Sequence, residues 1–184
     1  MNTSRLLLAI AAFLIGFSSM AQDVVYVDAS AFPVYGKISE ETNGRYERLP
    51  ARLEGVSRKA VWTRGRHSSG LYIRFRSNST SIHAKWESLF NNTYNHMTDI
   101  CTKGLDLYAL VDGEWRFVGP GRPSADGVST FTITKNMTPV DREFMLYLSM
   151  YDGVKSIEIG VDKGAYIEQP AVNSPSQEKP IVMY

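Results

Sequence analysis

The length, composition and charge of the chain set its broad class. It has 184 residues, 43% of them hydrophobic, and carries 20 Lys and Arg against 19 Asp and Glu. This near-neutral balance gives no broad attraction to nucleic acid or to an anionic membrane, so no nucleic-acid partner is expected. The one cysteine, Cys101, can form neither an internal disulfide nor a paired-cysteine zinc site, so the fold has to rely on its core. We expect no metal and no other cofactor.

The first 21 residues have the pattern of a secretory signal peptide. A short polar stretch with one positive charge, residues 2–5, precedes an apolar run at residues 6–17 that is too short to span a bilayer comfortably. Ser19 and Ala21 then place small residues at the two positions that a signal peptidase reads. We therefore expect residues 1–21 to be removed and the protein to be secreted or periplasmic, without stable membrane insertion. An uncleaved membrane anchor is the alternative.

Alternation of apolar and polar residues predicts a series of short strands along the rest of the chain. In residues 70–77, for example, the apolar Leu71, Ile73 and Phe75 share one face. The Asp112-Gly113 pair predicts a tight hairpin, because both residue types tolerate positive φ. The expected strands lie, in chain order, at residues 24–28, 60–63, 70–77, 80–87, 105–111, 115–117, 131–133, 144–150 and 157–161.

The pattern as a whole predicts an all-β fold. Many short strands at close spacing, separated by Gly and Asp turns, are typical of an antiparallel β-sandwich or jelly roll. No segment shows a helical period over ten or more residues. We expect this single domain to occupy residues 22–169.

The C-terminal tail has a different character. Residues 170–178 are rich in Pro, Ser and Asn and predict a linker. Residues 179–184 then read Lys-Pro-Ile-Val-Met-Tyr, with four apolar residues in a row and no alternation. Such a run is typical of a strand that is buried on both faces of a parallel sheet. We therefore interpret 179–184 as the orphan first strand of a following α/β domain.

No complete catalytic signature is present in the chain, which lacks a G-x-S-x-G elbow, an H-E-x-x-H pair and a phosphate-binding glycine loop. No catalytic residue and no metal ligand is therefore assigned. His96 lies in a long polar loop, a place where function is often carried, although an internally satisfied loop is the plainer interpretation.

Four other residues are candidates for binding a ligand or a neighbouring domain. Asp106 and Tyr108 share one face of a strand and could bind a sugar hydroxyl or an arginine, or form an outer-face pair with Arg116. Arg122 lies in a rigid Gly-Arg-Pro turn and could grip a carboxylate, or be an ordinary surface arginine. Tyr147, with Tyr151, could form an aromatic platform for sugar rings, or be covered by loops or another domain.

Several short motifs resemble one family. Residues 104–108 read Gly-Leu-Asp-Leu-Tyr, the Gly-x-Asp-Leu-Tyr pattern of the N-terminal domain of bacterial SGNH-hydrolase-type esterases. Residues 98–102 depart from that pattern, which has a glycine-containing turn there. The supporting motifs, in the order and spacing of that family, are Val61-Trp62, residues 69–76, His96-Met97, residues 115–119, residues 121–123, residues 146–148 and residues 157–161.

The resemblance implies a division of labour. In that family a stretch like 179–184 leads into a Gly-x-Ser segment, so the nucleophile and its partners would lie in a C-terminal SGNH hydrolase domain. This chain would then be a non-catalytic accessory domain of a secreted esterase that acts on acylated carbohydrate or another ester. A free-standing carbohydrate-binding module is the second hypothesis, and a remnant without an independent role is the third.

Overall fold

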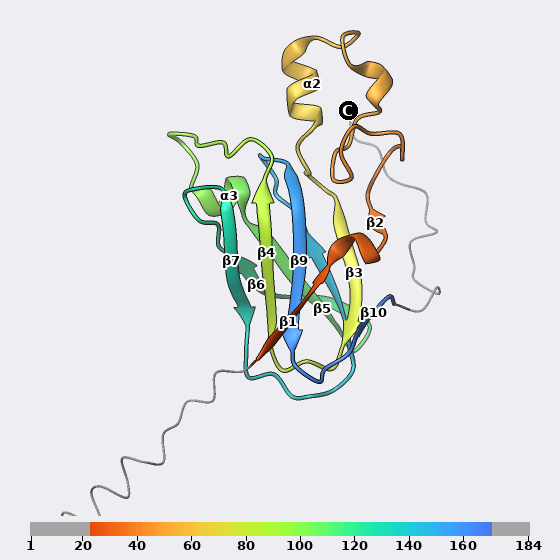
Figure 1. Ribbon diagram of the computed structural model, residues 1–184, viewed down its shortest axis with the longest axis vertical. Coiled ribbons are helices and arrows are strands. Elements are labelled where there is room, and N and C mark those ends of the chain that lie inside the picture. Colours follow the sequence, from red (N-terminus) through yellow and green to blue (C-terminus); the bar gives the residue numbers. More distant parts are fainter. Residues whose placement is uncertain (1–22, 171–184) are drawn as a thin grey trace, which may run out of the picture.

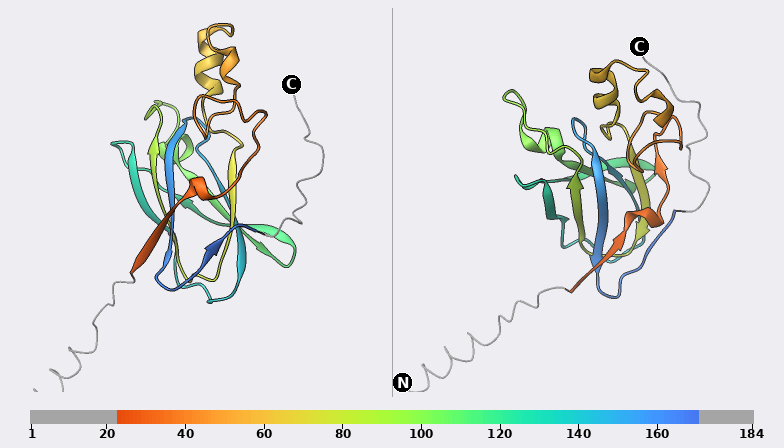
Figure 2. Two further views of the ribbon diagram at one scale, coloured as in Figure 1. Left: turned by 45° about the vertical axis from the view of Figure 1, so that its right-hand side comes forward. Right: turned by 45° about the horizontal axis from the view of Figure 1, so that its top comes forward.

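The computed structural model describes residues 23–170, which form two antiparallel sheets packed face to face (Figures 1 and 2). The four-stranded sheet has the order β1-β9-β4-β7. The six-stranded sheet has the order β10-β3-β8-β5-β6, and β2 also pairs with β3. The elements are β1 (Val24–Asp28), η1 (Ala29–Ala31), β2 (Val34–Tyr35), η2 (Ala51–Leu53), α2 (Lys59–Gly65), β3 (Tyr72–Ser77), β4 (Ile82–Ser88), α3 (Asp99–Lys103), β5 (Leu105–Val111), β6 (Glu114–Gly121), β7 (Val128–Thr134), β8 (Arg142–Tyr147), β9 (Val154–Asp162) and β10 (Ile167–Glu168).

The core lies between the two sheets and confirms the predicted all-β sandwich. Alternate residues of each strand point inward, as the period of two requires. Phe75 of β3 and Phe144 of β8 stack at 5.3 Å between ring centroids. The other large side chains that are almost wholly buried include Trp86, Leu71, Ile73, Ile82, Leu105, Leu107, Leu146, Ile157 and Ile159.

The prediction of a strand at residues 60–63 is wrong, because these residues belong to helix α2. The backbone N–H of Trp62 donates to the carbonyl of Arg58 at 3.0 Å, four residues earlier. Trp62 and Gly65 are the buried residues of α2, and their spacing of three places them on one helical face. Four residues are too few to tell this pattern from the alternation of a strand.

Other departures concern the strand ends and the outer faces. Strand β8 ends at Tyr147, so Met150, expected to face inward, is 56% exposed.

His83 was expected to lie in solvent but is half-buried. Its ring nitrogens lie 2.7 Å from the Oγ of Ser81 and 2.9 Å from the Oγ1 of Thr132. The short helix α3 has no counterpart among the expected elements. The predicted signal peptide, the strand at 179–184 and the linker after Pro170 lie outside the described residues.

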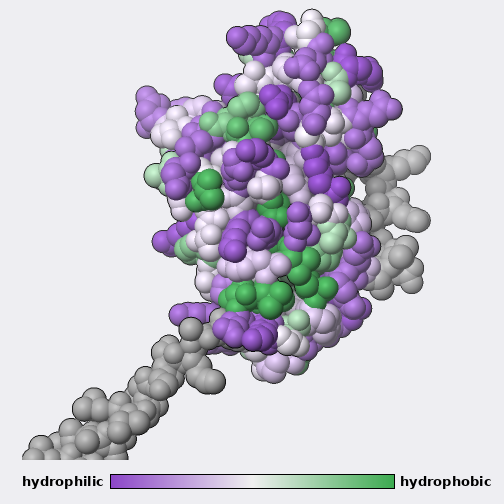
Figure 3. Space-filling model, in the orientation of Figure 1, coloured by the Kyte–Doolittle hydropathy of each residue, from purple (hydrophilic) through white to green (hydrophobic). Residues whose placement is uncertain are grey.

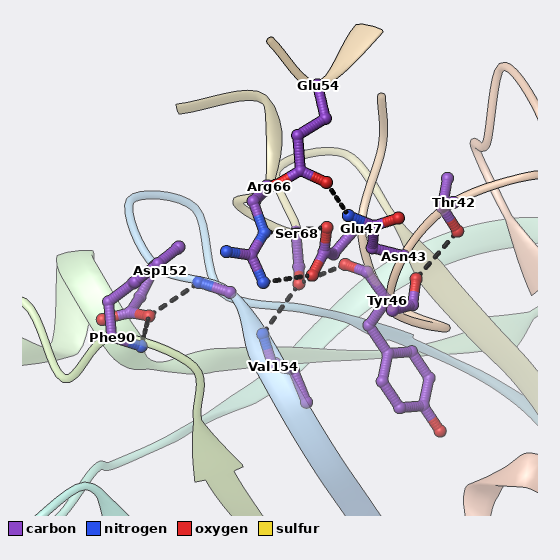
Figure 4. A network of polar contacts seen from close by, with 12 residues as sticks. Thr42, Asn43, Tyr46, Glu47, Glu54, Arg66, Ser68, Phe90, Asp152 and Val154 are labelled. Atoms are coloured by element: carbon purple, nitrogen blue, oxygen red, sulfur yellow. Dashed lines mark hydrogen bonds and ion pairs between the residues drawn. The ribbon is translucent and has the colours of Figure 1, made fainter. Parts of the chain in front are cut away.

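The segment between β2 and β3, which carries η2 and α2, projects beyond one end of the sandwich (Figures 1 and 2). A polar network ties it down (Figure 4). The guanidinium of Arg66 donates to both carboxylate oxygens of Glu47 at 3.0 and 2.8 Å. Ser68 donates from its Oγ to the carbonyl of Tyr46 at 2.7 Å and accepts from the N–H of Val154 at 2.9 Å. These bonds link the projection to β9.

The same network includes a buried carboxylate, that of Asp152 (Figure 4). It accepts backbone N–H bonds from Phe90, Asn92 and Gly153, at 3.0, 2.6 and 2.7 Å. One side chain therefore joins the loop before β9 to the loop after β4.

The four-stranded sheet faces the reader in Figure 3, and its outer surface mixes hydrophilic residues with small, separate apolar areas. Scattered apolar residues are ordinary on the surface of a folded domain and need no further explanation. Within residues 23–170, no helix has the length and apolar character needed to span a membrane.

We expect Glu47→Ala to destabilise the protein by about 3 kcal/mol, because it leaves the guanidinium of Arg66 without its buried partner. Glu47 is only 3% exposed. Urea denaturation measures the loss, and limited proteolysis shows whether the projection is cleaved first. Glu54→Ala is the matched control: Glu54 is exposed on the same projection and accepts one bond from Asn43, so its loss should stay within about 0.5 kcal/mol. Equal effects of the two variants would contradict this account.

A second polar cluster lies at the opposite end of the sandwich, where the carboxylate of Asp162 holds the turn between β3 and β4. It accepts bonds from the backbone N–H groups of Thr80 and Ser81, at 2.8 and 3.1 Å, and from both hydroxyls. Burial by itself would raise the pKa of Asp162, but hydrogen bonds from Ser81, Thr80 and Ser79 outweigh it and hold the pKa below its ordinary value.

This shift predicts a loss of stability in acid. A carboxyl group whose pKa is lower in the folded state contributes stability above its unfolded pKa, about 3.9, and loses it as the pH falls through the folded pKa. We expect Asp162→Asn to cost about 2 kcal/mol at pH 7 and to narrow the difference in unfolding free energy between pH 7 and pH 3. Asp112→Asn, in the exposed turn between β5 and β6, is the control and should leave that difference unchanged.

Candidate functional site

A groove of about 670 Å³ lies against the outer face of the six-stranded sheet. Strand β5 contributes two side chains to this groove. Because Leu105 and Leu107 are buried in the core, Asp106 and Tyr108 must face outward. Most of the lining is apolar. The lining residues are Gly70, Ile100, Cys101, Gly104, Asp106, Tyr108, Trp115, Pro120, Met145, Tyr147, Leu148 and Met150.

The glycine of the Gly-x-Asp-Leu-Tyr motif, Gly104, lines this groove. Helix α3 ends at Lys103 and is capped by Gly104, whose backbone N–H donates to the carbonyl of Ile100 at 3.1 Å. A Cβ at position 104 would lie 2.2 Å from that carbonyl oxygen, closer than any real contact. Only glycine therefore lets the helix turn directly into β5, and this turn places Ile100 and Cys101 beside Asp106.

A row of aromatic rings crosses the same face of the sheet from β2 to β6. Successive rings in this aromatic row lie on neighbouring strands, with centroids 5.1 to 5.7 Å apart. This spacing is typical of attractive stacked or edge-to-face pairs. Burial raises the pKa of Tyr147, so its hydroxyl keeps its proton at neutral pH. The row consists of Tyr35, Tyr72, Tyr147, Tyr108 and Phe117.

Arg74 also lies on this face and is only 4% exposed. Its guanidinium carbon lies 5.9 Å from the ring centroid of Tyr35 and 5.2 Å from that of Trp115, within the range of cation–π attraction. Glu143 forms an ion pair with it. Arg74 therefore holds Trp115 in place at the groove while its own charge is balanced outside the lining.

Asp106 is the one charged residue of the lining. Within residues 23–170 its carboxylate has no hydrogen bond and no ion pair. Arg116, considered as a partner, lies opposite Ala109, on the other side of the sheet from Asp106, and contacts Glu114 at 3.5 Å. Desolvation raises the pKa of Asp106, although its side chain still reaches water through the groove. Its position favours a ligand that donates a hydrogen bond or carries positive charge.

The structure thus brings together three of the five residues proposed from the sequence, namely Asp106, Tyr108 and Tyr147. His96 lies outside the groove on an exposed loop, with its Nδ1 3.0 Å from the Oδ1 of Asn95. Arg122 is exposed just after β6 and does not line the groove.

Sequence reasoning missed Trp115, Met145, Ile100 and Cys101. Trp115 had a signal, because it is the register partner of Leu110 and therefore shares a face with Tyr108. Ile100 and Cys101 had none, since helix α3 was not expected.

A serine and a histidine lie close together near the start of β4. Ser81 lies 2.7 Å from the Nε2 of His83, but this serine is 1% exposed, and the neighbouring carboxylate of Asp162 binds the serine rather than the imidazole. The arrangement is a buried structural cluster and not a nucleophile with its base. Residues 23–170 contain no group of three His, Cys, Asp or Glu side chains that could hold a metal ion.

The family model "GxDLY: N-terminus of Esterase_SGNH_hydro-type" matches residues 24–167. The chain belongs to this family. Its motif residues Gly104, Asp106 and Tyr108 all line the groove, and Leu105 and Leu107 are buried beneath them. The Gly-x-Asp-Leu-Tyr pattern therefore specifies one helix-to-strand turn together with the inner and outer faces of β5.

Two solved structures are similar to this member of the family. A protein of Bacteroides ovatus ATCC 8483 described as a GDSL-like lipase is 34% identical, with a TM-score of 0.75 over 80% of this chain. The salicylyl-acyltransferase SsfX3 from a tetracycline biosynthetic pathway is 17% identical, with a TM-score of 0.58 over 83% of this chain, a similarity of fold alone. This chain spans 43% of the length of each. Among curated proteins, none matches it.

We expect Gly104→Ala to destabilise this domain by about 2–3 kcal/mol, because the new methyl group overlaps a backbone carbonyl that cannot move without unwinding α3. Urea denaturation measures the loss. Gly121→Ala is a graded control, since its Cβ would lie 3.1 Å from the Cβ of Leu105, so a smaller adjustment could accommodate it. If Gly104→Ala unfolded at the same urea concentration as the wild-type protein, this account of the motif would be refuted.

Proposed function

We propose that this chain is the non-catalytic N-terminal accessory domain of a secreted SGNH/GDSL-type serine esterase. The observation that carries the proposal is the family match over residues 24–167, together with the motif residues in the wall of the groove. The partner is a C-terminal SGNH hydrolase domain, of which residues 179–184 would form the first strand. In that domain a serine would attack the ester with the help of a histidine oriented by an aspartate.

The proposed role is to pack on the hydrolase domain and to shape its substrate cleft. Support comes from the outer face of the six-stranded sheet, which offers a rigid aromatic row and a hollow beside it rather than an even surface. Rigid aromatic side chains contribute contact area at a low entropic cost. The proposed substrate is an acyl ester or an acetylated carbohydrate, and the proposed location is outside the cytoplasm.

A free-standing carbohydrate-binding module is the second candidate function. Tyr108 and Tyr147 beside Asp106 support it, because sugar rings stack on aromatic side chains and their hydroxyls donate to carboxylates. On this proposal the 184-residue chain would bind insoluble polysaccharide by itself, and Tyr147→Ala would abolish that binding.

The accessory role is tested on the full-length product of the gene that encodes this domain. We expect that product to hydrolyse p-nitrophenyl acetate and to lose this activity to a serine-reactive phosphonate, while the 184-residue chain alone shows none. Tyr147→Ala in the full-length protein should raise KM about tenfold with little change in kcat, because it alters the cleft and not the nucleophile. Tyr26→Ala, on the outer side of the other sheet, is the control. Absence of phosphonate-sensitive hydrolysis would overturn the proposal.

A further inference from the structure

The polar side chains of the groove are few, and the carboxylate of Asp106 is the one that carries a charge. The carboxylate of Asp106 accepts hydrogen bonds only, and the hydroxyls of Tyr108 and Tyr147 form none with the part of the chain that the structure describes. No Lys, Arg or His lines the groove. An anionic ligand would therefore meet a negative charge with no compensating cation, whereas a hydroxyl or an ammonium group would meet an acceptor.

The remaining walls are apolar and come from several elements. The apolar lining includes Ile100 of α3, Trp115 of β6, Met145 of β8 and Leu148 just beyond β8. The groove volume, about 670 Å³, lies within the range of ordinary small-molecule sites. A sugar, which carries hydroxyls around its whole edge, would have to leave several of them against these walls without partners, at a cost in free energy.

We propose that this groove binds a flat, mostly apolar ring that carries one hydrogen-bond donor, a hydroxyl or an ammonium group, and that it rejects the corresponding anion. The ring would lie among Trp115, Tyr147 and the two methionines, and its donor would bind the carboxylate of Asp106. The polarizable thioethers of Met145 and Met150 can adjust to rings of different outline. The proposal concerns the 184-residue chain alone, so it stands or falls independently of the proposed esterase partnership.

The groove contains its own reporter. Cys101 is the only cysteine of the chain, is exposed, and lies in the wall of the groove. Alkylation of the protein by iodoacetamide therefore measures access to this one site. Trp115 provides a second signal, because its fluorescence should change when a ring enters the groove.

The test uses three probes that share one ring and differ in charge: benzyl alcohol, benzylamine and benzoate. We expect benzylamine and benzyl alcohol to slow the alkylation of Cys101 with saturable concentration dependence at pH 7. Benzylamine should bind at least tenfold more tightly than benzoate, since only the ammonium ion attracts the carboxylate of Asp106. A similar effect of benzoate would overturn the proposal, as would no protection by any of the three.

Two variants locate the interaction. Asp106→Asn should remove the preference for benzylamine over benzoate and retain binding of benzyl alcohol, because an amide keeps an acceptor and loses the charge. Trp115→Ala should weaken both by about tenfold or more, with thermal unfolding used to confirm that it remains folded. Asp112→Asn, in the exposed hairpin turn outside the groove, is the matched control and should change nothing. An equal response of Asp106→Asn and Asp112→Asn would contradict the assignment.

Sugars are tested in the same experiment as the alternative ligands. Methyl glucoside and cellobiose should protect Cys101 only at concentrations well above those of benzyl alcohol. If either sugar protects at a lower concentration than benzyl alcohol, the apolar-ring proposal fails and carbohydrate binding takes its place. Neither result bears on ester hydrolysis by the full-length protein, so the two proposals fail separately.

Discussion

The burial of alternate residues of strand β5 is the constraint on which the rest of the site depends. Its Leu105 and Leu107 must enter the core, and the period of two then forces Asp106 and Tyr108 onto the outer face. Gly104 allows helix α3 to join this strand without an intervening loop, because any side chain there would overlap the carbonyl of Ile100. The groove exists because a helix ends directly against the outer face of a sheet.

On the outer face of the six-stranded sheet, aromatic side chains pack against one another. An antiparallel sheet commonly presents a polar face to water, yet here five aromatic rings follow one another across the strands. Arg74 lies among them, buried between Tyr35 and Trp115 and neutralised by Glu143. This packing orders the rings that border the groove before any ligand or partner is present, so less conformational entropy is lost on binding.

The proposed accessory role and the proposed ligand site give the outer face of the six-stranded sheet two different functions. An accessory domain needs a surface that a hydrolase domain can cover, and a ligand site needs a hollow that stays open. Both are compatible with a groove at the edge of an interdomain cleft, where a ring bound beside Asp106 would also contact the second domain. Ser81 is buried, and the carboxylate of Asp162 binds Ser81 rather than His83, so this pair does not form a nucleophile with its base.

Alternation of apolar and polar residues determined the sandwich: eight of the nine expected segments correspond to strands, because burial of one face imposes the period of two. It failed at residues 60–63, where a four-residue pattern fits a helix equally well. The outward faces of β5 and β8 were also readable, so Asp106, Tyr108 and Tyr147 could be predicted. Only the tertiary structure decided that these residues form a groove, that Arg74 is buried and that His96 and Arg122 lie apart from them. The physical reason is that strand register is set by contacts between segments far apart in sequence, such as the pairing of Asp106 with Tyr147 and of Leu105 with Gly121, which no local pattern encodes.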